Sequence, residues 1–358
     1  MKILRLSLLL ALITLLPGCG KLLYLSKLAW HQSYITFHSV PIREVLEDNR
    51  LTGDAKEKIH FIQEVKRFGE ERLGLKKTKS YSKYFETKGP ILSVLTASEK
   101  DCLRLYHWDF PITGRVTYKS FFEKDDVLKE KQSLEGKGYD TFVQKAGAYS
   151  TLGWLKDPIF SSMLQWDDAT LANLILHEMT HATVYFKGQT EINEQVATFV
   201  GNRGAIDFLT EKFGGESKEL IEAVHSQEDD LLFSRWIDQA CQELSCFYAG
   251  DISRDAKLKG REELFQRLKE DFNEKKASFK TESYKNLEKV DLNNAVFLAY
   301  HRYFHRLENL QALYEYWGKD LRKVIQFFRE IQASKENPSI YLERWMKERE
   351  ITAPASLR

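Results

Sequence analysis

The chain has 358 residues, of which 43% are hydrophobic and 29% charged, and this ordinary composition excludes an intrinsically disordered protein. Its 53 Lys and Arg residues almost cancel its 52 Asp and Glu residues, so no overall charge draws it to nucleic acid, and we expect no nucleic-acid partner. The sequence contains no internal repeat and no low-complexity tract, which favours a single folded unit over residues 41–358.

The first eighteen residues are typical of an export signal. A positively charged start is followed by an apolar run over residues 6–16, which is shorter than the ~20 residues that a membrane-spanning helix needs. The sequence Leu16-Pro17-Gly18-Cys19 then resembles a bacterial lipobox. We therefore expect residues 1–18 to be removed as a signal peptide and Cys19 to carry the lipid, with an uncleaved membrane anchor as the alternative.

Short elements are predicted before the middle of the chain. Residues 19–40 form an apolar membrane-proximal segment, and the spacing of apolar residues over 41–75 predicts helical structure that ends at Gly74. Strands are expected at residues 91–95, 115–118 and 141–149, with a charged helix at 124–135 before the last of them. These strands predict a small sheet that precedes a predominantly helical remainder, so the fold class is α+β.

From Ala169 onward the pattern is almost wholly helical. A charged amphipathic stretch covers residues 255–290, and a last helical block covers 293–349. Three cysteines remain besides Cys19, and their spacing matches no structural zinc site. A long-range disulfide is permitted among these three but not required.

One motif carries the chemistry. His177-Glu178-Met179-Thr180-His181 lies in a run that Asp167 or Asp168 can cap and that contains no glycine or proline as far as Phe186. Four residues apart on a helix, His177 and His181 share one face, where both rings can bind one Zn²⁺ ion, and Glu178 can act on a bound water. The alternative is a pair of core histidines with Glu178 in a salt bridge.

A hydrolytic zinc site takes three protein ligands and keeps one position open. A turn at residues 187–190 leads into a second helix, and Glu194 on this helix is a carboxylate in an apolar run, opposite the histidines. We predict that Glu194 is the third ligand, with Glu191 as the rival. Glu178 is then the general base. Tyr300 and Tyr303 are the candidate donors to the oxyanion, with Tyr303 preferred. The spacing of Phe297, Tyr300 and Phe304, however, is also that of packing residues.

Several stretches resemble the family of bacterial predicted aminopeptidases, which are membrane lipoproteins with an HExxH metal motif. The stretches are Trp108-Asp109-Phe110-Pro111, Gly147 to Trp154, Asp157-Pro158, His177 to His181, Asn193-Glu194, Ala197 to Val200, Asn293-Asn294-Ala295 and Tyr303. The resemblance covers nearly all of the chain after Cys19. It implies a zinc peptidase of the zincin type with exopeptidase activity.

The leading interpretation is therefore a lipid-anchored zinc metallopeptidase, an aminopeptidase acting on peptides in the bacterial cell envelope, on the periplasmic or exterior side of a membrane. An endopeptidase is possible within the same class, and a zincin-fold binding or scaffold lipoprotein without peptidase activity is the alternative. We expect the peptide to pair along the strand that ends around Tyr149. Asp157 is the first candidate to bind the free α-ammonium group, and its alternative role is to cap a turn before Pro158.

Overall fold

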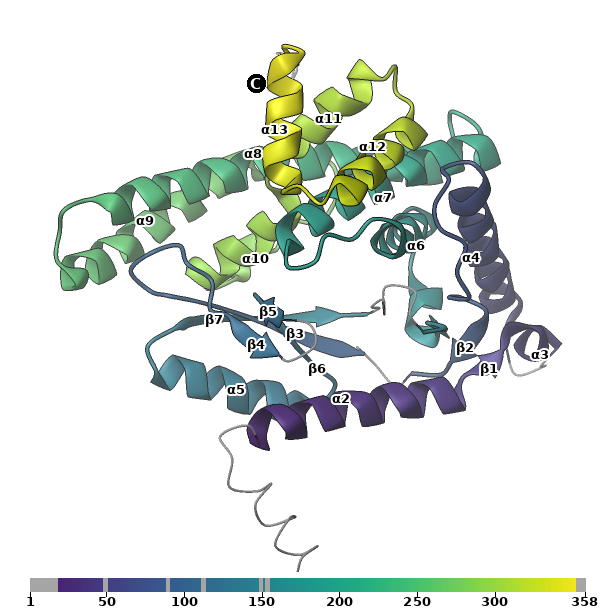
Figure 1. The fold of residues 1–358 in the computed structure, drawn as a ribbon, viewed down its shortest axis with the longest axis horizontal. Coiled ribbons are helices and arrows are strands. Elements are labelled where there is room, and N and C mark those ends of the chain that lie inside the picture. The colour runs from purple at the N-terminus through teal and green to yellow at the C-terminus, as the bar shows by residue number, and fades with distance from the viewer. Residues whose placement is uncertain are drawn as a thin grey trace, which may run out of the picture.

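The computed structural model describes residues 19–47, 51–87, 91–110, 114–147, 151 and 155–351. Within these residues the structure is mostly helical and contains three small sheets, so the predicted α+β class with helices dominant is confirmed. Figure 1 shows the sheets in the lower half of the molecule, α2 (Cys19–His38) beneath them, and the helices of the C-terminal half above them.

The central sheet is antiparallel, and its two faces are covered by different helices. Its strands lie in the order β6 (Lys119–Phe121), β3 (Leu92–Ser98), β7 (Asp140–Ala146). Because side chains alternate along a strand, Leu95 and Ala97 point to one face, where they share a hydrophobic core with α5 (Lys124–Gly136). Thr96 points to the other face, where Arg302 of α10 (Asn294–Phe304) donates a hydrogen bond to its hydroxyl.

The two other sheets are smaller. One pairs β1 (Val40–Pro41), β2 (Lys83–Phe85) and β8 (Ile159–Phe160), and the other pairs β4 (Trp108–Phe110) with β5 (Gly114–Val116). The predicted strands at 91–95, 115–118 and 141–149 correspond to β3, β5 and β7, with bounds that differ by a few residues. Residues 148–150, where the last predicted strand ends, lie outside the described part of the chain.

A helical hairpin forms the centre of the molecule. It consists of α6 (Asp168–Thr183) and α7 (Thr190–Phe213), which runs back along it. Two glycines of α7 allow the helices to approach closely: a Cβ atom on Gly204 would lie 2.8 Å from Cδ1 of Leu176, and one on Gly201 would lie 3.0 Å from the backbone oxygen of Asn173. The close approach matters because α6 and α7 carry the HExxH motif and Glu194.

Further helices surround this hairpin. They are α3 (Ile42–Glu47), α4 (Gly53–Glu71), α8 (Lys218–Ala249), α9 (Arg254–Lys275), α11 (Leu307–Tyr316), α12 (Leu321–Ser334) and α13 (Pro338–Glu348), with 3₁₀ turns at Ser161–Gln165, Lys276–Ser278 and Leu287–Lys289. One hydrophobic core joins α4, α6, α7 and the C-terminal helices, and a second joins α8, α9 and α10.

The prediction of a helical stretch over residues 255–290 is wrong in its second half. Helix α9 ends at Lys275, and the chain continues through short 3₁₀ turns. The reason is a long-range contact: the carboxylate of Asp229, on α8, accepts hydrogen bonds from the backbone N–H groups of Lys280 (2.8 Å) and Thr281 (2.7 Å). A carboxylate that is bound in this way holds the segment in a non-helical path.

Two further observations concern the chain as a whole. Among the residues that the structure describes, no helix combines the length and the apolar character needed to cross a membrane. Cys102, Cys241 and Cys246 are free thiols, so the disulfide that their sequence permitted does not occur among them.

Candidate functional site

Helix α6 presents the two histidines. It begins where the sequence predicts, because the side chain of Asp167 accepts a hydrogen bond from the backbone N–H of Thr170 (2.7 Å) and caps the helix. The helix continues without interruption past the motif, so His177 and His181 lie one turn apart on the same face. Their Nε2 atoms are 3.1 Å apart.

The turn between α6 and α7 brings Glu194 to these histidines. Gly188 adopts a φ of +75° in this turn, a left-handed conformation that favours glycine. Both polar groups of the Asn193 side chain bond the backbone of Phe186, at 2.8 Å each, and so fix the start of α7 against the end of α6. Oε2 of Glu194 consequently lies 3.4 Å from Nε2 of His177 and 3.3 Å from Nε2 of His181.

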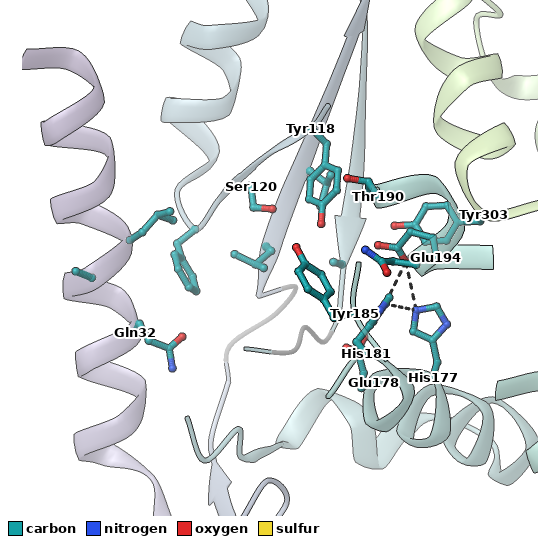
Figure 2. A pocket seen from close by; sticks show the side chains of 17 residues that line it. Gln32, Tyr118, Ser120, His177, Glu178, His181, Tyr185, Thr190, Glu194 and Tyr303 are labelled. Atoms are coloured by element: carbon teal, nitrogen blue, oxygen red, sulfur yellow. Dashed lines mark hydrogen bonds and ion pairs between the residues drawn. The ribbon is translucent and has the colours of Figure 1, made fainter. Parts of the chain in front are cut away.

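The three atoms match the spacing of metal ligands. Figure 2 shows the two imidazoles and the Glu194 carboxylate converging on one point. A tetrahedral ion with ligand bonds of about 2.0–2.1 Å separates neighbouring ligand atoms by about 3.3 Å, close to the 3.1, 3.3 and 3.4 Å found here. His181 and Glu194 are buried, so this set has the protection from bulk water that a metal centre needs.

The two carboxylates at the site differ in proton affinity. Burial raises the pKa of Glu178 above its ordinary value, against the opposing effect of the two histidines. Burial also acts to raise the pKa of Glu194, but the charges and hydrogen bonds of the histidines outweigh it and hold this pKa well below its usual range. Glu194 is therefore suited to be a ligand, and Glu178 is suited to take up a proton.

A cavity of about 560 Å³ opens onto these residues. One wall is helix α2, which contributes Leu28 and Gln32, and another is the face of the central sheet that carries Val94 and Ser120. A second cavity, of about 880 Å³, is lined by α6, α8 and residues 280–283, and it shares His177 and Glu178 with the first. His177 and Glu178 can thus be reached from two directions, and His181 from the first cavity.

Three tyrosines surround the site. Tyr303, from α10, lines both cavities and is drawn next to Glu194 in Figure 2, while Tyr118 and Tyr185 line the first cavity. Burial raises the pKa of all three phenols, and the charge of Glu194 raises it further, so each remains a hydrogen-bond donor at neutral pH. Sequence reasoning pointed to Tyr303 but missed the other two.

Of the two predicted substrate-binding residues, the structure describes Asp157, which does not line the first cavity. Asp157 is 3% exposed, and its carboxylate accepts hydrogen bonds from the backbone N–H (2.9 Å) and the hydroxyl (2.7 Å) of Thr151, while its carbonyl accepts one from the N–H of Tyr81 (2.6 Å). These contacts are those of the turn-forming alternative. Tyr149 is outside the described residues. Strand β7 is at an edge of the described sheet, and pairing of a peptide there stays a prediction.

Glu191, the rival ligand, does not face His177 and His181. It lies one turn before Glu194 on α7, and its carboxylate is 3.6 Å from Nδ1 of His301 and 3.8 Å from Nε2 of His305. The geometry therefore brings Glu194, and not Glu191, together with the histidines of α6.

The comparisons with known proteins give one match. Residues 23–340 match the model of a family described as "Putative aminopeptidase". Comparison with curated proteins and with solved structures gave no match. The matched range contains the whole α6–α7 hairpin and Tyr303.

Proposed function

The chain belongs to the "Putative aminopeptidase" family, and from this premise we propose that it is a zinc-dependent peptidase of the zincin type, with the ion held by His177, His181 and Glu194. The observation that carries the proposal is the triangle of ligand atoms at 3.1, 3.3 and 3.4 Å, next to Glu178 on a cavity. Zinc held by these residues would supply Lewis-acid chemistry, lowering the pKa of a water toward ~7 and polarising the scissile carbonyl.

Glu178 supplies the proton transfer in this proposal. Its carboxylate lies on the same cavity as the three ligands, and its raised pKa suits a group that accepts the proton of the attacking water. The same carboxyl then gives this proton to the leaving amine, so Glu178 ends each cycle in its starting state.

The test of this function is hydrolysis by the full-length chain, purified in detergent, of matched peptides with a free or an acetylated amino terminus. An aminopeptidase cleaves the free peptides and releases the first residue, whereas an endopeptidase cleaves both kinds. A chain that binds zinc and hydrolyses no peptide in a broad panel would contradict the proposal and favour a binding lipoprotein.

We assign Tyr303 the role of donor to the developing oxyanion, because it is a partly buried, protonated phenol beside Glu194 that lines both cavities. We expect Tyr303→Phe to lower kcat by about 10²–10³-fold with zinc content unchanged. The matched control is Tyr300→Phe, one turn earlier on α10, whose ring packs against Phe142 and Phe233. Equal kcat values for parent and Tyr303→Phe would exclude the assignment.

We propose that the protein is anchored in the bacterial cell envelope by a lipid on Cys19. Three large apolar residues of α2 are exposed and seven residues apart, so they share one face of the helix: Leu23 (60%), Trp30 (71%) and Phe37 (84%). The other side of α2 packs on the protein, where the hydroxyl of Tyr24 donates to the carbonyl of Ser120 (2.8 Å). An exposed apolar helix face directly after the anchor suits contact with lipid.

Replacing Cys19 by Ser is expected to release the protein from the membrane fraction or to leave residues 1–18 attached, because the lipid has no acceptor thiol. Fractionation of cells, with the mass of the product, measures both outcomes. Cys246→Ser is the control, since Cys246 is an exposed free thiol far along the chain. A Cys19→Ser product that lacks residues 1–18 and still sediments with membranes would place the anchor elsewhere.

A further inference from the structure

A second group of ligating side chains lies where α7, α8 and α10 meet. Glu191 comes from the first turn of α7, Asp238 from α8, and His301 and His305 from the end of α10. The two imidazole rings are stacked, with centroids 4.1 Å apart and planes inclined by 24°. Both histidine side chains are about one-fifth exposed.

Each ring turns one nitrogen to one carboxylate and its other nitrogen to the other carboxylate. Asp238 Oδ1 lies 2.7 Å from Nδ1 of His305 and 3.5 Å from Nε2 of His301. Glu191 Oε1 lies 3.6 Å from Nδ1 of His301 and 3.8 Å from Nε2 of His305. The stacked rings are thus sandwiched between two acidic side chains.

This arrangement places electron-rich atoms close together on the Glu191 side of the rings. A neutral His305 ring that donates its Nδ1–H to Asp238 (2.7 Å) directs the lone pair of Nε2 toward Glu191. The His305 lone pair and the Glu191 carboxylate oxygen then face one another, with Nδ1 of His301 3.6 Å from the same oxygen, and a cation between these atoms makes the contacts favourable. A carboxylate that binds the far nitrogen of a histidine is also the usual support of a metal-binding imidazole.

We propose that Glu191, His301 and His305 form a second metal site, for a divalent transition-metal ion such as zinc, and that Asp238 orients both histidines as a positioning residue. The three ligand atoms lie within 4.8 Å of one another. Glu191 is 52% exposed, and Oε1 also accepts a hydrogen bond from the Gln195 side chain (3.2 Å). A cavity of about 550 Å³ lined by Glu191 and His301 gives access from outside. Two imidazoles and one carboxylate suit zinc and its neighbours in the first row.

An ion at this second site would also hold in place the helices that carry Glu194 and Tyr303. Glu191 is one turn from Glu194 on α7, and His301 is two residues from Tyr303 on α10. Bound metal would therefore fix the start of α7 against α10 and hold Glu194 and Tyr303 in their positions. The site's proposed task is structural support of the first centre, with no substrate contact of its own.

The experiment separates the sites by starting from the full-length chain with His181→Ala, which removes a ligand of the first site only. This variant, freed of metal, is titrated with zinc chloride, and bound zinc is counted by elemental analysis. We expect one zinc per chain to remain. Adding Glu191→Gln should weaken this binding by at least about tenfold, and Asp238→Asn by about 10–100-fold. Adding His225→Gln, on the same helix as Asp238, should have no effect.

If a histidine variant fails to fold, Glu191→Gln still tests the second site. The Glu191 side chain is half exposed at a helix end, so we expect this substitution to leave the fold intact. A His181→Ala chain that binds no zinc would overturn the second site, as would unchanged binding after Glu191→Gln. Failure of the first site looks different: His181→Ala would then keep the full zinc content of the parent, while Glu191→Gln would still lower it by one ion.

Discussion

Replacing Glu178 by Gln is expected to lower kcat by about 10²–10⁴-fold while the chain keeps its zinc. The amide preserves the shape and the hydrogen-bonding capacity of the side chain but cannot accept a proton from water. His177, His181 and Glu194 are untouched by the change, so the three ligand atoms remain in place. Peptide hydrolysis under saturating substrate, together with elemental analysis of the purified variant, measures both parts of the prediction.

The matched control for Glu178→Gln is Glu222→Gln on α8. Glu222 lines the cavity of about 880 Å³ that Glu178 also lines, but it belongs to neither group of ligating side chains. The control separates loss of the base from a general loss of negative charge near the site. Unimpaired hydrolysis by Glu178→Gln would refute the role of Glu178, and a variant that had lost its zinc would show that Glu178 supports the metal instead.

The largest expected loss of stability follows from Asp140→Ala. Asp140 begins β7 and is 6% exposed, and its carboxylate receives two hydrogen bonds from Arg261 of α9, at 2.7 and 3.0 Å. It also accepts one from the backbone N–H of Asn294, at the start of α10 (3.1 Å). Removal of the carboxylate takes away the buried partner of the Arg261 guanidinium, which keeps Glu262 (2.9 Å) and the backbone carbonyl of Lys100 (2.8 Å). Loss of one partner of a buried ion pair costs about 3–5 kcal/mol in the free energy of unfolding.

Chemical denaturation measures the change in the free energy of unfolding. Two further variants show whether the change comes from the loss of the buried ion pair. Asp140→Leu combined with Arg261→Met removes both charges, and we expect its stability to return close to that of the parent. Asp109→Ala breaks an ion pair with Arg115 that is more than half exposed, and it should change stability by about 1 kcal/mol or less. Equal losses from Asp140→Ala and Asp109→Ala would contradict the idea that the buried pair joins β7 to α9 and α10.

The hairpin that carries the candidate site could be predicted because its signals are local. Asp167 caps α6, the four-residue spacing places His177 and His181 on one face, and Gly188 supplies the turn before Glu194. Each of these features depends on residues close together in the chain. A short sequence was therefore sufficient to indicate which side chains meet.

The surroundings of the site depend on long-range contacts and could not be predicted in this way. Tyr118 reaches the cavity only because β6 pairs with β3, and Leu28 lines it only because α2 packs against the sheet. The non-helical path after α9 likewise depends on Asp229, about fifty positions earlier. Sheet register and helix docking join distant segments, and apolar periodicity does not specify their partners.

The second cluster had a signal that sequence reasoning passed over. His301 and His305 are four residues apart, the same spacing as His177 and His181, and their rings stack at the end of α10, where His305 is the C-cap residue. What the sequence could not supply was the pair of carboxylates, because Glu191 and Asp238 come from two other helices. The spacing of histidines therefore indicates a pair of metal ligands. Whether a third ligand lies beside this pair depends on how the other helices pack.

The most direct test of the zinc-peptidase account is the rate of hydrolysis of a free-amine peptide as zinc is returned to the metal-free chain. The account predicts no hydrolysis without metal and recovery that saturates with added zinc in the parent. It predicts no recovery in His181→Ala, which lacks one of the three ligands. Hydrolysis at the parental rate after complete removal of metal, or full recovery in His181→Ala, would contradict it.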